Sequence, residues 1–545
     1  MSDHPDQSRA IDRLRANLKA ADIRISDEDL EGLIEKDFLS TVLSSEAILA
    51  RYPSDLVPDY LSAWGEERPS LGSPSDREGN GASTTTTRPE RVPGYPSLAE
   101  IAGRVQRREV SPVELAEEAL ARIAERNPLL NAFRLVLDNE ARTAAREAEA
   151  EIAGGHYRGP LHGIPIAVKD LFAMTGTPTT AGSLILADSV TDFDSAVVER
   201  LKAAGAVIVG KTNMSEFAYS GASNNAHYGP THNPWNPEHD TGGSSSGSGA
   251  AVADGMVFGA LGSDTGGSIR MPSALCGIVG LKPTYGRNSL FGAVTLSWSL
   301  DHAGPMTRTV ADTAIMQSVL AGYDERDLRT RHVPVPNYRD ALRRGVRGLR
   351  IGVLRADGSD LPLATDEVLD AWKSGLSALA RAGAELVELD LPEFNDLRPL
   401  NSCILAGEAT AYHEPMLRER PQDFGEFPRQ RLISAYAYGP NVGVRAQQAR
   451  GQIRRKLNRI FDNVDLLSTP TMPYAAPLLA QMKRNTWFTG PFNALGWPAI
   501  TVPVGLGADR LPLALQLAGR PWDEATVLSA AAVVEAEGPW PGGKP

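Results

Sequence analysis

Residues 242–272 read GGSSSGSGAAVADGMVFGALGSDTGGSIRMP and place two Ser/Gly clusters on either side of an apolar run. Glycine lets the main chain adopt positive φ and approach other groups closely. A short apolar run bounded by glycines is typical of a buried strand. We therefore expect N–H groups and serine hydroxyls from both clusters to meet beside a strand, although functionless loops of small residues fit the same composition.

The rest of the chain alternates short apolar segments with segments of helical periodicity. Strands are expected at residues 164–168, 207–209, 256–261, 349–354 and 386–389, and helices at residues 199–204, 366–382 and 444–461. This alternation predicts an α/β protein with a largely buried sheet.

Two helix starts precede this region. Ser97 and Ser111 are each followed three residues later by Glu, which is the capping-box pattern, and Pro112 suits a first helical position. We expect a helix from Ser111 to about residue 127 and another at residues 139–152.

Residues 65–95 are rich in Pro, Gly, Ser and charged side chains, so they predict a flexible linker. This linker would separate a main domain, residues 96–545, from a small helical domain at residues 1–64.

The expected N-terminal domain has apolar residues at helical spacing but too few for a core of its own. Ile11, Leu14 and Leu18 lie on one face, and Ser26 with Asp29 predicts the start of a second helix. The unit must therefore pack either on the body of its own chain or on a second copy, which would make a homodimer through these helices.

Composition excludes several classes of protein. The 545 residues are 42% hydrophobic and 22% charged, which suits a large globular core, and the net charge of −12 argues against nucleic acid as a partner. The two cysteines, Cys276 and Cys403, form no disulfide framework and favour a reducing compartment. With no apolar signal core and no 18-residue apolar run, we expect a cytoplasmic protein without a membrane partner.

Three motif matches are weak. Residues 205–212, GAVIVGKT, fit the phosphate-loop formula, but the apolar strand lies between the two glycines instead of before them. Residues 243–247 fit the G-x-S-x-G elbow, but residues 233–241 before them contain two prolines and are expected to form a loop. A nucleotide-binding protein remains a remote alternative, and an α/β-hydrolase is disfavoured.

The third match is a histidine cluster. His227, His232 and His239 have no common ligand spacing and no cysteine nearby, so we expect no metal there and interpret them as surface or hydrogen-bonding histidines.

Lys169 ends the apolar segment at residues 164–168. Burial lowers the pKa of a lysine, and a neutral lysine can act as a general base. The alternative is a lysine whose stem packs on the core while its ammonium group reaches water.

Taken together, these segments resemble the amidase signature family. The resemblance rests on Lys169, on GGSSSGSG, on GSDTGGSIRMP and on CGIVGLKPTYG at residues 276–286, and it covers roughly residues 96–535. Further matching segments are SLDHAGPMTR at residues 299–308, Thr469-Pro-Thr471, Phe492-Asn493 and GWPAITVP at residues 496–503. It implies an α/β/α sandwich with a large mixed central sheet and an enzyme that needs no cofactor.

The resemblance also implies the site residues. Ser268 would be the nucleophile, Lys169 the base and Ser244 the bridging serine, which the family holds in a cis peptide after Gly243. An oxyanion hole would be formed by main-chain N–H groups of the second cluster. They belong to Thr265, Gly266, Gly267 and Ser268.

Charged and hydroxyl residues flank these positions. Asp264 and Arg270 either contact substrate or hold the loop, and the second is the favoured interpretation. Ser245 and Ser246 are expected to hydrogen-bond nearby backbone.

Alignment with the family suggests the pocket walls. Residues 213–220 would border the pocket, with Ala218 near the nucleophile as a substrate-binding residue. Trp298, Trp487 and Phe488 would line the acyl side or belong to the core.

The function expected is an amidohydrolase that cleaves a small-molecule amide, or a related carbamate or urea C–N bond. The alternative is the glutaminase subunit of a tRNA-dependent amidotransferase, which would need an ammonia channel and a partner subunit. The helical unit at residues 1–64 weakly resembles the small accessory subunit of such complexes. The sequence does not single out a substrate.

Overall fold

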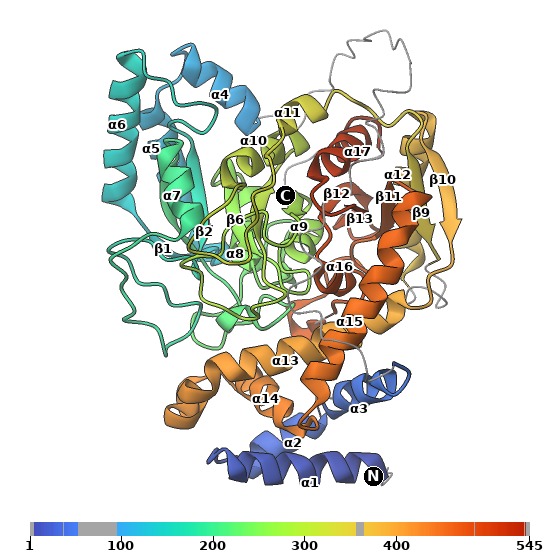
Figure 1. The fold of residues 1–545 in the computed structure, drawn as a ribbon. Coiled ribbons are helices and arrows are strands. Elements are labelled where there is room, and N and C mark those ends of the chain that lie inside the picture. Colours follow the sequence, from blue (N-terminus) through green and yellow to red (C-terminus); the bar gives the residue numbers. More distant parts are fainter. Residues whose placement is uncertain are drawn as a thin grey trace.

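The structure is a computed structural model that describes residues 5–35, 38–52, 95–355, 364–483, 485–538 and 540. The linker expected at residues 65–95 lies outside these residues except for Tyr95. The main body is a large mixed sheet sandwiched by helices, which confirms the expected α/β fold (Figure 1).

Eleven strands form the central sheet in the order β1-β3-β2-β6-β8-β7-β12-β13-β11-β9-β10. Their bounds are β1 Phe133–Val136, β2 Pro165–Lys169, β3 Val207–Thr212, β6 Gly259–Ser263, β7 Val279–Lys282, β8 Ala303–Thr307, β9 Arg350–Leu354, β10 Glu385–Leu389, β11 Leu466–Pro470, β12 Ala499–Leu506 and β13 Pro512–Gly519. β2 pairs in parallel with β3 and β6, and β9 pairs in parallel with β10 and β11. The remaining pairs are antiparallel, so the sheet is mixed.

Helices on the sheet are α4 Leu98–Gln106, α5 Pro112–Leu130, α6 Asp138–Ala153, α7 Ala196–Ala203, α8 Ser246–Ala253, α9 Arg270–Cys276, α10 Val310–Leu320, α11 Tyr338–Ala341, α12 Asp366–Arg381, α16 Gly490–Leu495 and α17 Glu524–Glu537. Short 3-10 turns occur at Glu216–Ala218, Pro421–Asp423, Ala435–Ala437, Arg459–Asp462 and Leu479–Gln481. Ser97 and Ser111 form the two expected capping boxes at the starts of α4 and α5.

Some predicted boundaries are wrong. β6 begins at Gly259 instead of residue 256, because the N–H of Met256 donates to Ala251 O and closes the end of α8. Residues 233–241 do not form a plain loop, since β4 His232–Asn233 and β5 Asn236–Asp240 make a separate two-stranded sheet. A narrow ribbon tolerates the prolines there, because its outer edges need no N–H donor.

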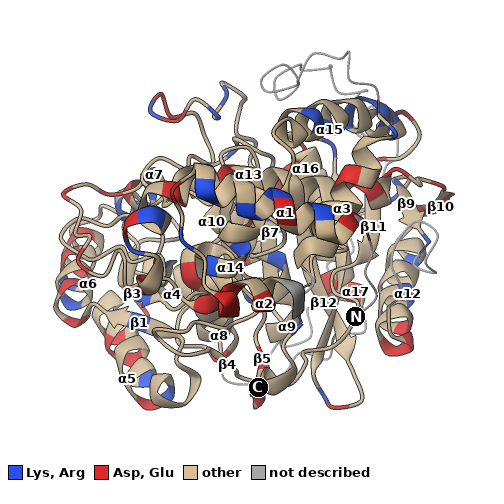
Figure 2. Ribbon diagram, turned by 90° about the horizontal axis from the view of Figure 1, so that it is seen from below, with Lys and Arg blue, Asp and Glu red and all other residues tan. Residues whose placement is uncertain are grey.

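A second helical layer lies beneath the sheet and contains α13 Phe394–Glu419, α14 Glu426–Ser434 and α15 Val442–Asn458. The N-terminal helices α1 Pro5–Ala20, α2 Asp27–Glu35 and α3 Phe38–Leu49 pack against it on the underside of the molecule (Figures 1 and 2). Leu14 and Leu18 are buried there, and Asp29 is paired with Arg429 of α14 at 2.8 Å. The apolar face of the N-terminal unit is therefore covered by its own chain.

The strands next to the site are buried on both faces. Every residue of β2, β3 and β6 is buried, because helices cover both sides of this part of the sheet. Within the ranges that the structure describes, no helix combines the length and apolar character needed to span a membrane.

Candidate active site

Lys169 and Ser263 are the last residues of two neighbouring parallel strands, β2 and β6. The carboxyl ends of parallel strands meet at one edge of a sheet, and ligand sites of α/β proteins lie outside such edges. Lys169 Nζ is 2.8 Å from Ser263 Oγ, 2.7 Å from Ser244 Oγ and 2.9 Å from Ser245 Oγ. One fully buried amine thus contacts hydroxyls from both Ser/Gly clusters.

The pKa of Lys169 lies well below its ordinary value. Burial is the main cause, and the negative charges of Asp264 and Asp301 oppose it. Among the residues that the structure describes, no side-chain carboxylate contacts the amine directly, and its three hydrogen-bond partners are serines. The interpretation of Lys169 as a solvated lysine is therefore wrong: the amine is buried and favours its neutral form.

Ser244 lies in the turn that leads into α8. The peptide bond between Gly243 and Ser244 is cis, as expected. The N–H of Gly243 donates to Gly221 O at 3.0 Å, and Ser244 O accepts from the N–H of Ser215 at 3.3 Å. A Cβ on residue 243 would lie 2.3 Å from Ala222 O, so only glycine fits here.

Ser268 lies between β6 and α9 and is buried, with 5% of its surface exposed. Its carbonyl accepts a hydrogen bond from the N–H of Ser245 at 3.3 Å, which ties the second cluster to the first. Gly267 has φ +136°, and a Cβ there would approach Thr489 Oγ1 to 2.2 Å. The turn that presents Ser268 therefore requires glycine at position 267.

The N–H groups of this turn differ in how they are used. Gly267 N–H donates to Asp264 Oδ1 at 2.8 Å, so it is occupied within the loop. Among the residues described, no acceptor is found for the N–H groups of Thr265, Gly266 and Ser268. Three of the four N–H groups expected to form the oxyanion hole are thus available for a ligand. The N–H of Gly267 is not, because it already donates to Asp264.

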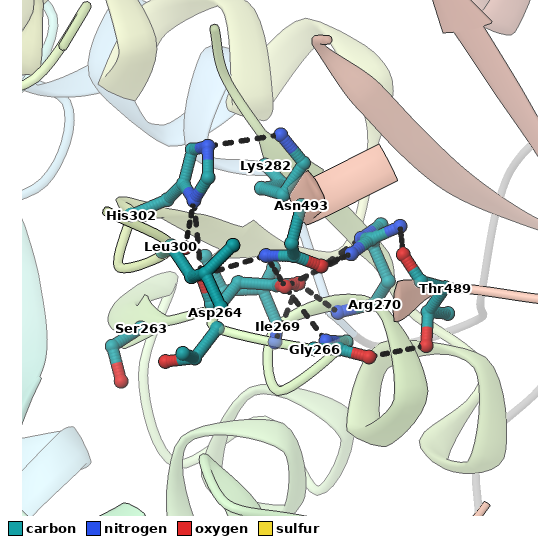
Figure 3. A network of polar contacts seen from close by, with 12 residues as sticks. Ser263, Asp264, Gly266, Ile269, Arg270, Lys282, Leu300, His302, Thr489 and Asn493 are labelled. Carbon is teal, nitrogen blue, oxygen red and sulfur yellow. Dashed lines mark hydrogen bonds and ion pairs between the residues drawn. The ribbon is translucent and has the colours of Figure 1, made fainter. Parts of the chain in front are cut away.

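Asp264 and Arg270 hold the loop, as the favoured interpretation expected (Figure 3). Both side chains are fully buried, and Arg270 donates to Asp264 through Nε at 3.0 Å and Nη2 at 2.9 Å. Arg270 also donates to Thr489 O, Gln516 Oε1 and Asn493 Oδ1. Burial opposes ionisation of Asp264, but the Arg270 charge outweighs it and holds the pKa of Asp264 far below its usual value.

A second polar group supports the same loop from its other side (Figure 3). His302 Nδ1 lies 3.1 Å from Asp264 O, and His302 Nε2 lies 3.2 Å from Lys282 Nζ. Thr265 Oγ1 donates to Asp301 Oδ1 at 2.7 Å, and burial raises the pKa of Asp301 to about 6. The turn that holds Ser268, the candidate nucleophile, is therefore fixed by residues from β7, from the segment just before β8 and from α16, which lie far from it in the sequence.

The expected pocket walls are dispersed. Phe488 is buried in the core, whereas Trp298 is 45% exposed and contacts Tyr412. Trp487 lies under the guanidinium of Arg398 at 5.1 Å.

Ala218 has φ +59° in a turn whose Ser215 N–H donates to the Ser244 carbonyl, so its segment borders Ser244. A cavity of about 380 Å³ lies beyond this segment. It is lined by Glu216, Tyr219, Ser220, Asn224, Asn225, Ala226, Pro230, Glu426, Phe427, Pro428 and Met482, and none of the Ser/Lys cluster reaches it.

The weak motifs have structural roles. Lys211 of the phosphate-loop match lies within β3 and is paired with buried Asp170 at 2.9 Å. His227 contacts Glu216, while His232 and His239 contact carbonyl groups. Within the described part of the chain, no group of three metal-ligating side chains gathers.

Ser263 is the site residue that sequence reasoning missed. Its position as the last residue of a strand parallel to the Lys169 strand was the available signal, but it requires knowledge of the pairing. Ser245 does bond the backbone of Ser263, as expected, but it also contacts Lys169. Ser246 contacts the Thr231 hydroxyl instead of backbone.

Comparisons with known proteins agree with this geometry. The Amidase family model matches residues 114–528. A glutamyl-tRNA(Gln) amidotransferase subunit of Anaeromyxobacter dehalogenans (strain 2CP-C) is 41% identical over 480 residues, which cover 82% of this chain and 96% of that protein.

Solved structures agree as well. A chain from a structure described as a vestigial protein complex that reveals the evolutionary origins of an s-triazine catabolic enzyme is 36% identical with a TM-score of 0.77. The match covers 81% of this chain and 98% of that chain. A bacterial aryl acylamidase of the amidase signature family is 29% identical with a TM-score of 0.76, covering 82% of this chain and 97% of its own. The chain therefore belongs to the amidase signature family and is a hydrolase of C–N bonds.

Proposed function

We propose that the protein hydrolyses a small-molecule amide through an acyl-enzyme on Ser268, with Ser244 and Lys169 relaying the proton. The observation that carries this proposal is the fully buried Lys169 amine, 2.7 Å from Ser244 Oγ. A serine hydroxyl is a weak nucleophile and needs an adjacent base. A lysine kept neutral by burial is such a base.

Hydrogen bonding around the amine indicates which hydroxyl gives it a proton. Ser245 Oγ donates its own hydrogen to Ser263 O, so it accepts from Lys169. A neutral amine has two N–H groups and one lone pair, so the lone pair is left for Ser263 or Ser244. Of these two, Ser244 is the serine that the resemblance to the amidase signature family assigns to the bridging position, which favours it as the proton donor.

The reaction then follows in two stages. Ser244 passes its proton to Lys169 and takes the proton of Ser268, whose oxygen attacks the amide carbon. The oxyanion would accept hydrogen bonds from the N–H groups of Thr265, Gly266 and Ser268. Lys169 returns the proton through Ser244 to the leaving nitrogen, and the C–N bond breaks. Water then attacks the ester by the same relay, which releases the acid and restores Ser268.

The test is Ser268→Ala in the full chain. We expect turnover to be lost and folding retained, because the serine is small and its carbonyl contact to Ser245 is main-chain. Release of ammonia or amine is measured on a panel of amides, carbamates and ureas, with Ser374→Ala on the exposed side of α12 as control. Substantial turnover by Ser268→Ala would contradict the mechanism.

A second candidate is the glutaminase subunit of a tRNA-dependent amidotransferase. The 41% identity to a relative named as a glutamyl-tRNA(Gln) amidotransferase subunit favours it. The same relay would then release ammonia from glutamine for a partner protein. Hydrolysis of simple amides by the purified chain alone supports the free-standing amidase, whereas hydrolysis of glutamine only after addition of a partner supports the amidotransferase.

A further inference from the structure

Arg398 on α13 is a partly buried cation without a polar partner. Among the described residues it makes no hydrogen bond and no ion pair, and its only stacking contact is the Trp487 ring, 5.1 Å from the guanidinium. Burial alone lowers its pKa to about 10. Arginine inside a protein is normally matched by carboxylate or phosphate groups, because its desolvated charge is otherwise unfavourable.

Neighbouring acidic side chains on the same helix do not supply that match. The Asp396 carboxylate accepts a hydrogen bond from the Tyr52 hydroxyl and forms an ion pair with Arg51. Glu393, just before the helix, forms an ion pair with Lys456. The charges around Arg398 are therefore already neutralised in pairs that exclude it.

The position of Arg398 relates it to the candidate nucleophile turn. Asn401 lies one turn along α13, and its Nδ2 is 3.7 Å from the point where a Cβ of Gly266 would lie. Thr486, the neighbour of Trp487 in sequence, lies 3.5 Å from the same point. Asn401 and Thr486 therefore both lie beside Gly266. Arg398 lies about 4.5 Å from Asn401 along the axis of α13, and it stacks on Trp487, the residue after Thr486.

Asn401 adds a second unmatched group. Its side chain is 3% exposed, and its Oδ1 has no hydrogen-bond partner within the described ranges. A buried amide oxygen without a donor is unfavourable unless a ligand supplies the donor. Asn401 therefore offers an acceptor beside Gly266, and Arg398 offers a cation one turn away on the same face of α13.

We propose that the substrate carries a carboxylate in addition to its scissile amide, and that Arg398 binds this carboxylate while Asn401 accepts an N–H of the substrate. The inference rests on the proposed amidase function and narrows its substrate class to anionic amides. The guanidinium fork suits a carboxylate because it donates two parallel hydrogen bonds. Arg398 is a specificity residue here and takes no part in bond breaking.

The experiment compares matched substrates with the full chain. Succinamic and glutaramic acids carry the amide and a carboxylate, while butyramide and pentanamide carry only the amide. We expect the wild type to prefer the acids, and Arg398→Met to lower kcat/KM for the acids about 100-fold while changing kcat/KM for the neutral amides by less than about 3-fold. Arg398→Lys should recover part of the loss, because the charge remains.

Arg418→Met is the matched control, since this arginine lies near the other end of α13 and pairs with Glu414. Thermal unfolding of each variant checks that folding is retained. Equal losses on acids and neutral amides, or wild-type preference for the neutral amides, would overturn the anionic-substrate inference and leave the amidase proposal intact. Failure of the wild type to hydrolyse any amide of the wider panel would instead overturn the amidase proposal and this inference with it.

Discussion

At the scale of single residues, the burial of Lys169 dominates the site. The side chain ends a fully buried strand, so its amine can be satisfied only by hydroxyls that the fold brings to it. The same burial favours a neutral amine and makes the residue costly for stability. Activity and stability therefore place opposite demands on this position.

Lys169→Met tests the two effects separately, one on activity and one on the pH dependence of stability. We expect kcat/KM to fall by about 1,000-fold or more, because the variant removes the group that we propose as general base. The unfolded wild type binds a proton that folded Lys169 does not, so its free energy of unfolding rises with pH up to the ordinary lysine pKa. This rise should be smaller in the methionine variant than in wild type, and not absent, because buried Lys282, whose pKa is also lowered, still contributes to it. Urea unfolding near pH 7 and pH 9 measures the difference, with Lys202→Met as surface control. A pH dependence equal to that of wild type would contradict a buried neutral lysine.

Asp301→Asn tests a group for which the free energy of unfolding is expected to fall with rising pH, opposite to Lys169. Burial raises the pKa of folded Asp301 from 3.8 to about 6, so the folded state binds more protons than the unfolded state between these values. The contribution of Asp301 to stability should therefore fall, by up to about 3 kcal/mol, as pH rises from about 4 to about 6. The difference in free energy of unfolding between wild type and Asp301→Asn, measured by urea unfolding, should fall across this range as pH rises. The exposed Asp188→Asn control should parallel wild type.

At the scale of elements, the turn between β6 and α9 is shaped by residues distant in sequence. Asp264 caps the turn through the N–H groups of Gly267 and Ile269, and Arg270 ties Asp264 to α16 and β13. The turn therefore holds Ser268, the proposed nucleophile, and the N–H groups without an acceptor among the described residues in fixed positions, as electrostatic stabilisation of an oxyanion would require.

Arg270→Met should remove these contacts and lower the free energy of unfolding. The variant leaves the Asp264 charge buried without its partner, so we expect a loss of about 3–5 kcal/mol in the free energy of unfolding. Combining it with Asp264→Asn should recover part of the loss, because the stranded charge disappears. Arg107→Met, which breaks an exposed ion pair with Glu109, should leave stability unchanged in the same denaturant titration.

At the scale of the whole molecule, the N-terminal helices complete the layer that carries Arg398 and Asn401. Leu39 and Val42 of α3 are buried in the contact region with α13, and Arg445 of α15 donates to Leu49 O. The relatives match nearly their full lengths without covering about a fifth of this chain, and the Amidase match begins at residue 114. This unit is therefore an addition that supports the α13 face from below.

Deletion of residues 1–52 should lower the thermal unfolding midpoint and expose the apolar side of α13–α15. Light scattering on the full chain and on the deletion variant distinguishes two roles. If the deletion variant self-associates and the full chain does not, the N-terminal helices cover an apolar surface of their own chain. A full-length dimer that becomes a monomer on deletion indicates the homodimer predicted from the sequence. An unchanged midpoint would contradict a supporting role.

Sequence patterns located the site but not its full geometry. Lys169, Ser244 and Ser268 follow from motif and resemblance, and the structure brings Lys169 and the Ser244 hydroxyl into contact. Strands such as β7, β8 and β12 were not expected, because short segments with glycine and proline give little periodic signal and owe their extended form to neighbours in the sheet.

The sequence by itself determined the α/β class, the family and the residue types of the relay, since these depend on local pattern and motif. Only the tertiary structure decided that Ser263 joins Lys169, that Gly267 N–H is already bonded, and that Arg398, one helical turn from Asn401, has no polar partner among the described residues. The physical reason is that burial, pairing of strands and competition for hydrogen bonds depend on residues far apart in the chain, which a local pattern does not specify.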